Sequence, residues 1–317
     1  MKIALLGTGF GQVHAAEYAG RADVDDVVVF GRNPTKLAKT EADFGFVTTT
    51  DLDAVLTDAA VDLVDICLPT RLHADVAVTA MQAGRDVLIE LPLAATLADA
   101  RRIVATQQAT GRRAFVDMFG RFSPANQHLR EAAARRRLGE LKVLEIEGRT
   151  ALLWPGYDLT LRTLVLDMTH TGFDLVTGLL GYPSMVHALG VDGPAGRGSA
   201  AEIILGYPGA VARCTSSALM PAPYGVRGGW RATFTGGVLE YAMRAGFTGQ
   251  GPATLTEHSA DGERVIDLPA ASPYAEMIDH VLACLAGRAD NLIDPASALP
   301  ALELTLDVHR RLTATAD

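Results

Sequence analysis

Residues 1–14 read MKIALLGTGFGQVH, in which a short apolar run leads into three closely spaced glycines. The run Ile3–Leu6 has the composition of a buried β-strand, and the residues from Gly11 onward favour a helix. Gly7 permits a tight turn between the two, and Gly9 lets backbone N–H groups approach a ligand closely. Because the N-terminal end of a helix attracts anions, the stretch predicts a strand–turn–helix unit that binds the pyrophosphate of a dinucleotide.

The glycine spacing departs from the usual Gly-x-Gly-x-x-Gly pattern, because Gln12 stands at the third glycine position and Gly11 comes one residue earlier. Taken alone, the motif also fits a glycine turn without a ligand. The cofactor-binding residues that we expect from this turn are Gly7, Thr8, Gly9, Phe10, Gly11 and Gln12.

The overall composition is that of a soluble globular protein, and we expect its partner to be a small-molecule substrate. The 317 residues are enough for two domains, each with its own core. The formal net charge is −9, and 49% of the residues are apolar. The acidic balance argues against nucleic acid as a partner, and no apolar run approaches the ~20 residues of a membrane-spanning helix. No charged and apolar leader precedes the first strand, so we expect no secretory signal and a cytoplasmic protein.

The cysteines indicate neither disulfides nor a metal site. Cys67, Cys214 and Cys284 lie far apart in apolar surroundings, without Cys-x-x-Cys or Cys/His ligand spacing. We therefore expect buried free thiols in a reducing compartment and no bound metal.

Short apolar runs alternate with amphipathic stretches up to residue 118. Strands are expected at 2–6, 27–30, 62–67, 86–90 and 114–118, and helices at 10–19, 34–43, 51–58, 73–83 and 96–110. This alternation is typical of a parallel sheet covered by helices on both faces, with its ligand at the carboxyl ends of the strands. The sequence therefore predicts an α/β protein whose first domain, residues 1–122, is a Rossmann dinucleotide-binding domain.

The pattern changes after Pro124. Helices are expected at 124–137, 160–180, 273–287 and 297–312, and strands at 141–149, 185–191, 201–206, 210–217, 230–235, 237–242, 253–257 and 263–268. This order predicts a second α+β domain, residues 123–317, with a mostly antiparallel open sheet that serves substrate binding and oligomerisation. Alternating residues such as Val211, Arg213 and Thr215 would leave one sheet face in water, so we expect a homodimer or homotetramer formed through this sheet.

Several segments in fixed order carry a resemblance that covers essentially the whole chain. They are the glycine turn followed by His14, Leu68–Ala74 (Pro-x-x-x-His), Ala83–Ala94 (Gly-Arg-Asp-Val-x-x-Glu-Leu-Pro-Leu-Ala), Phe119–Pro124 and Leu138–Glu140. They resemble the Gfo/Idh/MocA family of NAD(P)-dependent oxidoreductases, which includes glucose–fructose oxidoreductase and inositol dehydrogenase. The resemblance implies hydride transfer at nicotinamide C4. It also implies that the cofactor is contacted by Leu68, Pro69, Thr70, His73, Glu90 and Leu91.

The end of the second strand predicts the choice of cofactor. No acidic residue stands there to bind the ribose 2′-OH of NAD. The segment Gly31–Lys36 supplies a guanidinium and an ammonium instead, which suit a 2′-phosphate. We expect Gly31, Arg32, Asn33 and Lys36 to favour NADP(H), with NAD(H) as the alternative if Arg32 only stacks on the adenine.

The catalytic residues of the family are altered in this chain. The resemblance implies a lysine in the Glu-Lys-Pro segment, where Leu91 stands here, and a histidine at the position of Thr171. His170 comes one residue early, and one residue turns a helical side chain by about 100°. The candidate proton donors are His170, oriented by Asp174, and Tyr157; the candidate substrate-binding residues are Trp154, Arg162 and Asp167.

Three functions fit these features. The first is an NADP(H)-dependent reductase of a small carbonyl, sugar-derived or C=N compound, and the apolar Leu91 suits a substrate that needs little help with its proton. The biliverdin reductase branch resembles this family and also lacks the lysine. The second is a conventional sugar or cyclitol dehydrogenase that uses His170. The third is a non-catalytic sensor that binds NADP(H).

Overall fold

The structure is a computed structural model that describes residues 1–152, 158–245 and 251–314. Its chain divides into two compact units. The first comprises Met1–Phe119 together with Ser272–Leu299, and the second comprises Gly120–Ala271 together with Pro300–Asp317.

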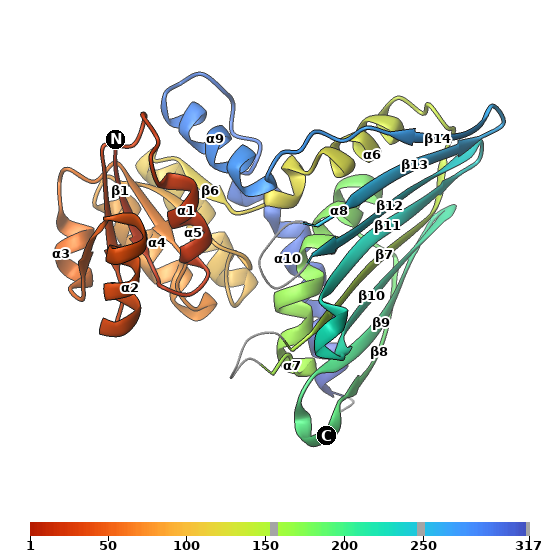
Figure 1. The fold of residues 1–317 in the computed structure, drawn as a ribbon, viewed down its shortest axis with the longest axis horizontal. Helices are drawn as coiled ribbons and strands as arrows, with labels where there is room; N and C mark the ends of the chain where they lie inside the picture. The colour runs from red at the N-terminus through yellow and green to blue at the C-terminus, as the bar shows by residue number, and fades with distance from the viewer. Residues whose placement is uncertain (153–157, 246–250, 315–317) are drawn as a thin grey trace. The chain divides into compact units, whose positions relative to one another are not determined.

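The first unit is built on a six-stranded parallel sheet in the order β3-β2-β1-β4-β5-β6, with helices on both faces (Figure 1). The strands are β1 (Lys2–Leu6), β2 (Asp26–Phe30), β3 (Val47–Thr49), β4 (Leu63–Ile66), β5 (Asp86–Ile89) and β6 (Ala114–Val116). The helices between them are α1 (Gly11–Tyr18), α2 (Pro34–Phe44), α3 (Leu52–Thr57), α4 (His73–Gln82) and α5 (Leu97–Thr110). The strand order reverses between β1 and β4, which is where such sheets bind their ligands.

The sequence forms these elements for recognisable physical reasons. The apolar runs Ile3–Leu6 and Val87–Ile89 are fully buried in the sheet, as expected of parallel strands that are covered on both faces. The Thr96 hydroxyl accepts a hydrogen bond from the Asp99 N–H and starts α5, and Gly111, with φ +66°, ends it. The short strand β3 was not predicted.

Residues 272–299 return to the first unit, which differs from the predicted continuous domain 123–317. Helix α9 (Pro273–Leu285) buries Met277, Ile278 and Val281, and the Arg113 guanidinium donates to the carbonyl oxygens of Cys284 and Leu285. These tertiary contacts leave no local signature in the sequence. The first boundary, after Phe119, lies close to the predicted residue 122.

The second unit contains an eight-stranded sheet in the order β14-β13-β12-β11-β7-β10-β9-β8. Its strands are β7 (Leu141–Ala151), β8 (Met185–Asp192), β9 (Ser199–Tyr207), β10 (Ala210–Met220), β11 (Val226–Phe234), β12 (Gly237–Ala245), β13 (Ala253–Ser259) and β14 (Gly262–Ile266). Its helices are α6 (Pro124–Ala134), α7 (Leu161–Leu164), α8 (His170–Leu180) and most of α10 (Pro295–Ala314). All strand pairs are antiparallel except β7 with β10, which confirms the predicted mostly antiparallel sheet.

The helices of this unit differ from prediction at two places. The predicted helix 160–180 contains a π-helical turn, Val165–Thr169, between α7 and α8. The predicted helix 124–137 ends at Ala134, and Arg137, beyond this end, forms an ion pair of 2.5 Å with the buried Glu257. No helix in the described part of the chain is long and apolar enough to cross a membrane.

Candidate functional site

The glycine turn after β1 has the shape of a phosphate-binding loop. Gly7 has φ +125°, and a Cβ atom there would overlap the carbonyl oxygen of Cys67, so only glycine fits. Gly9 is exposed, and a Cβ atom there would meet nothing within 4 Å. The chain is therefore packed tightly against β4 on one side of the turn and leaves open space on the other.

The N-terminal end of α1 faces this turn without an internal partner for its positive charge. The helix begins at Gly11 with no side-chain N-cap and no acidic residue in its first turn. The Gln12 and Val13 N–H groups donate to the carbonyl oxygens of Gly9 and Phe10, so an external anion such as a pyrophosphate would bind the backbone N–H groups that precede them. The Gln12 amide, expected at the cofactor, donates instead to Thr40 Oγ1 at 2.6 Å and connects α1 to α2.

The end of β2 has no room for the acidic side chain that is typical of NAD sites. A Cβ atom at Gly31 would lie 2.7 Å from Thr8 Cγ2 and 3.0 Å from Leu37 Cδ2. Arg32 and Lys36 follow with exposed side chains. Asn33 has a structural role, because its Oδ1 accepts the Lys36 N–H at 3.1 Å and caps α2.

His73 fixes the loops after β4 and β5 to one another. Its Nε2 lies 2.7 Å from the Leu68 carbonyl oxygen and its Nδ1 lies 3.0 Å from that of Pro92. Burial lowers the pKa of His73 below its ordinary value, although these carbonyl contacts oppose the shift. The ring thus connects Leu68 to Pro92, which directly follows Leu91, and Leu68 and Leu91 are both half-buried.

A buried polar cluster lies directly behind the glycine turn. His14 Nδ1 lies 2.7 Å from Asp65 Oδ2, and its Nε2 lies 3.0 Å from Asp117 Oδ2 and 3.9 Å from Glu90 Oε1. The Tyr18 hydroxyl also donates to Asp65 at 2.8 Å. Burial and the neighbouring Asp117 carboxylate raise the pKa of Glu90 well above its ordinary value.

In the second unit, His170 points into the core. Its Nδ1 lies 2.6 Å from Thr305 Oγ1 on α10, and burial lowers its pKa to about 4. A histidine that is neutral at physiological pH has no proton of ordinary acidity to give, so this placement does not support the predicted role of proton donor.

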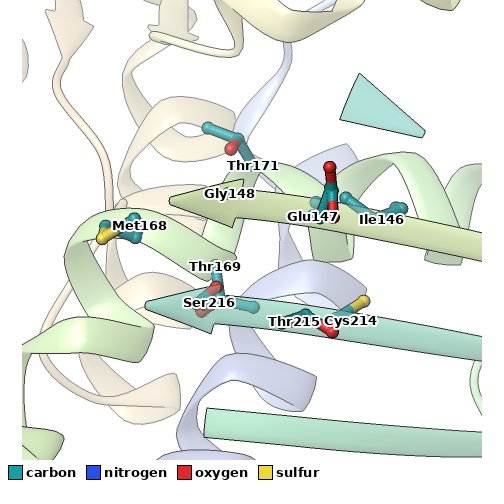
Figure 2. Close-up of a pocket in the computed structure, with 10 residues that line it drawn as sticks. Ile146, Glu147, Gly148, Met168, Thr169, Thr171, Cys214, Thr215 and Ser216 are labelled. Atoms are coloured by element: carbon teal, nitrogen blue, oxygen red, sulfur yellow. Dashed lines mark hydrogen bonds between the residues drawn. The ribbon is translucent and has the colours of Figure 1, made fainter. Parts of the chain in front are cut away.

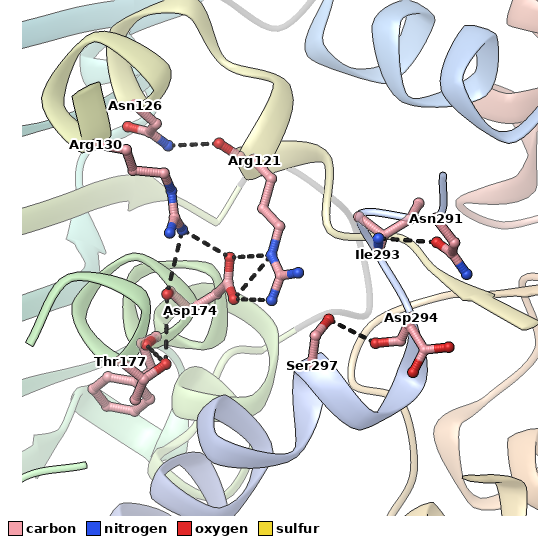
Figure 3. A network of polar contacts seen from close by, with 11 residues as sticks. Arg121, Asn126, Arg130, Asp174, Thr177, Asn291, Ile293, Asp294 and Ser297 are labelled. Atoms are coloured by element: carbon pink, nitrogen blue, oxygen red, sulfur yellow. Dashed lines mark hydrogen bonds and ion pairs between the residues drawn. The ribbon is translucent and has the colours of Figure 1, made fainter. Parts of the chain in front are cut away.

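Asp174 binds two guanidinium groups rather than the ring of His170. Its carboxylate is ion-paired with Arg121 at 2.8 Å and with Arg130 at 3.3 Å (Figure 3). The hydrogen bonds of this carboxylate therefore hold the two arginines, and they do not orient His170 as predicted.

A small pocket of about 140 Å³ opens beside the same helical segment. Figure 2 shows its lining, which comes from β7, β10, the π-helical turn and the start of α8 and includes Glu147, Met168, Thr171, Thr215 and Ser216. Thr171, at the position of the family histidine, lines this pocket, whereas His170 does not.

The other predicted substrate residues are not brought together here. Asp167 and Arg162 have exposed side chains, and neither lines the pocket. Trp154 and Tyr157 lie outside the described residues.

Sequence reasoning missed Asp65 and Asp117 as partners of His14, and Arg121 and Arg130 as partners of Asp174. A signal existed for the first pair, because Asp65 interrupts an apolar strand and Asp117 directly follows another. No pattern pointed to the arginines, because Arg121 lies 53 residues from the aspartate that it binds.

A parallel sheet with a glycine turn and a free helix end at its switch point defines a dinucleotide-binding Rossmann domain. Residues 1–118 match the model of the GFO_IDH_MocA family, described as "Oxidoreductase family, NAD-binding Rossmann fold". This match of the first 118 residues agrees with the resemblance seen in the motifs.

Two curated relatives and one solved structure illustrate the similarity. The chain is 34% identical over 152 residues to 4-carboxy-2-hydroxymuconate-6-semialdehyde dehydrogenase of a Sphingobium species, with 47% of each chain covered. It is 30% identical over 184 residues to inositol 2-dehydrogenase of Rhizobium meliloti, with 57% of this chain and 55% of the relative covered. The chain thus spans about half the length of the curated relatives it matches. UDP-N-acetylglucosamine 3-dehydrogenase from Acidithiobacillus ferrooxidans has the same fold, with a TM-score of 0.82, 25% identity and coverage of 99% and 98%.

Proposed function

We propose that this protein is an NADP(H)-dependent oxidoreductase that acts on a small sugar-derived hydroxy or carbonyl compound. The observation that carries the proposal is the open glycine turn, which leads into the uncapped N-terminal end of α1. In addition, β2 ends without an acidic residue. When bound, the dinucleotide supplies or accepts the hydride at nicotinamide C4.

The preference for NADP(H) is supported by the packing of Gly31. An aspartate or glutamate at this position would collide with Thr8, so the usual acceptor for the ribose 2′-OH is excluded sterically. The exposed guanidinium of Arg32 and ammonium of Lys36 provide donors for a 2′-phosphate. NAD(H) remains the alternative cofactor.

The substrate class is supported by the pocket of the second unit. Thr171 and Ser216 offer hydroxyl groups, and Met168 adds an apolar wall. A pocket of about 140 Å³ suits one small polar group of a hydroxylated compound rather than a large ligand. The relatives named as dehydrogenases of inositol and of a sugar nucleotide agree with this class.

The proton that accompanies hydride transfer cannot come from the lysine of the family, because the apolar Leu91 stands at its position. His170 is also a poor donor, because burial lowers its pKa to about 4. We therefore propose Tyr157 as the donor. The change Tyr157→Phe should lower kcat by roughly 10²–10⁴ with little effect on NADPH affinity.

An absorbance screen tests the proposal. Polyols and sugars are offered with NADP⁺, and small aldehydes, keto sugars and imines with NADPH. Steady turnover of one class is expected. Tight dinucleotide binding without turnover of any of them would favour the non-catalytic sensor, which the loss of the family lysine at Leu91 makes the second candidate.

We also propose that the open face of the eight-stranded sheet pairs with a second copy of the chain. Leu189 and Val191 on β8 are 77% and 58% exposed, and Ile204 on β9 is 44% exposed, so the face carries apolar area that a partner would cover. Light scattering should give a dimer or tetramer, and a monomer at micromolar concentration would contradict the proposal.

A further inference from the structure

The buried cluster behind the glycine turn gathers three carboxyl groups around a single imidazole. Asp65 and Asp117 are fully buried, and the Glu90 side chain is 14% exposed. Among the described residues, these three carboxylates form ion pairs with His14 but with no lysine or arginine. Several carboxyl groups this close together in a protein interior cannot all stay ionised without protons or a cation to balance them.

The two nitrogens of His14 face different surroundings. Nδ1 is directed at Asp65 Oδ2, and the Tyr18 hydroxyl donates to the same oxygen, so this carboxylate is well placed to hold the Nδ1 proton. Nε2 lies at hydrogen-bond distance from the Asp117 carboxylate and also faces Glu90, so a cation placed between these groups would take the place of the Nε2 proton. A carboxylate that orients the far nitrogen of a histidine is the usual outer support of a metal ligand.

Asp117 supplies an independent sign that something further binds here. Its Oδ2 contacts His14, but its Oδ1 is buried without a hydrogen-bond partner in the described part of the chain. Buried carboxylate oxygens normally have a partner, so this oxygen has room for a further ligand.

The spacing of the ligand atoms fits a small divalent ion. Two atoms that bind the same Zn²⁺ at ~2.1 Å in tetrahedral geometry lie about 3.4 Å apart. The distances from His14 Nε2 to Asp117 and Glu90 are 3.0 and 3.9 Å, and all three ligand atoms lie within 4.8 Å of one another. One imidazole and two carboxylates suit Zn²⁺ or Mn²⁺, with positions left for water.

We propose that His14 Nε2, Glu90 and Asp117 bind a divalent metal ion, with Asp65 as the positioning residue of His14. The ion would neutralise the carboxylates behind the glycine turn and tie α1 to the ends of β5 and β6. The sequence alone gave the opposite expectation of no metal site, because these ligands are scattered over 104 residues of chain.

The test uses the tag-free full-length chain, stripped with EDTA and titrated with Zn²⁺ and with Mn²⁺ by calorimetry. One site per chain is expected, and Zn²⁺ should bind more tightly. Glu90→Gln and Asp117→Asn should each weaken binding more than tenfold, and Asp65→Asn should weaken it about 10–100-fold. Cys67→Ser is the matched control, because Cys67 lies on the Nδ1 side of His14, and it should bind the metal like the wild type.

Three results would overturn the proposal. They are no saturable binding by the wild type, affinity kept within twofold in Glu90→Gln, or binding lost in Cys67→Ser. The first result would mean that protons, on His14 and on one carboxyl, balance the charge instead. Circular dichroism establishes that each variant is folded. If Asp117→Asn does not fold, the partly exposed Glu90 decides the outcome.

Discussion

His170 Nδ1 lies 2.6 Å from Thr305 Oγ1, and this contact directs the imidazole into the core of the second unit. The Thr305 hydroxyl donates to the Ala301 carbonyl at 2.7 Å, so its oxygen accepts the Nδ1 proton. Nε2 is left as the unprotonated nitrogen, buried without a partner among the described residues. The ring is therefore held in its neutral form.

Acid should destabilise the protein through His170. Burial lowers its pKa from 6.5 to about 4, so between these values the unfolded chain binds a proton that the folded chain does not. The free energy of unfolding should therefore fall by about 3 kcal/mol as the pH decreases from 6.5 to 4, and this contribution should level off below 4. Urea denaturation of the wild type and His170→Gln measures the effect. In the variant the free energy of unfolding should no longer fall between pH 6.5 and 4 in this way, and the folded variant should keep kcat within about tenfold of the wild type. An unchanged pH dependence would contradict the lowered pKa of His170.

Asp174→Asn should cost roughly 3 kcal/mol of stability, the lower end for a buried ion pair, because Arg121 and Arg130 would both lose their charged partner. Thermal or urea denaturation measures the loss. Glu131→Gln is the control on α6, since the exposed Glu131–Arg135 pair is worth only about 0.3–0.5 kcal/mol. Equal effects of the two changes would show that Asp174 is not a structural anchor.

Gly7→Ala and Gly9→Ala should separate folding from cofactor binding. At Gly7 the added methyl group meets the Cys67 carbonyl at φ +125°, so stability should fall by more than about 1 kcal/mol. At Gly9 the methyl group enters open space, so stability should stay within about 0.5 kcal/mol while NADPH affinity falls at least tenfold. Denaturation and calorimetric titration distinguish the two, and a Gly9→Ala variant with unchanged affinity would place the pyrophosphate elsewhere.

Much of the fold follows from local patterns. The buried runs of β1, β4 and β5 and the glycine turn predicted the parallel sheet and the dinucleotide-binding domain, because each signal lies within a few adjacent residues. The direction of His170 could not be predicted in the same way. The π-helical turn Val165–Thr169 changes the helical phase just before it, and the partner that holds the ring, Thr305, lies 135 residues away.

The polar partners show the same limit. Asp174 was recognised as a motif position, but its arginines come from a separate segment, and Asp65 was read only as part of an apolar strand. Such side chains meet because of the tertiary fold, so their spacing along the chain carries no signal. Gly31 was only partly predictable. The absence of an acidic residue at the end of β2 was visible in the sequence, whereas the contact with Thr8 that leaves no room for one was not.

The most direct test of the central claim is a calorimetric titration of the wild type and of Arg32→Ala with NADPH and with NADH. NADPH should bind the wild type more tightly, because Arg32 and Lys36 provide charge-assisted donors for the 2′-phosphate and Gly31 excludes an acid. Arg32→Ala should narrow the difference by about 1–3 kcal/mol. Equal affinities of the wild type for the two cofactors, or no binding of either, would contradict the account.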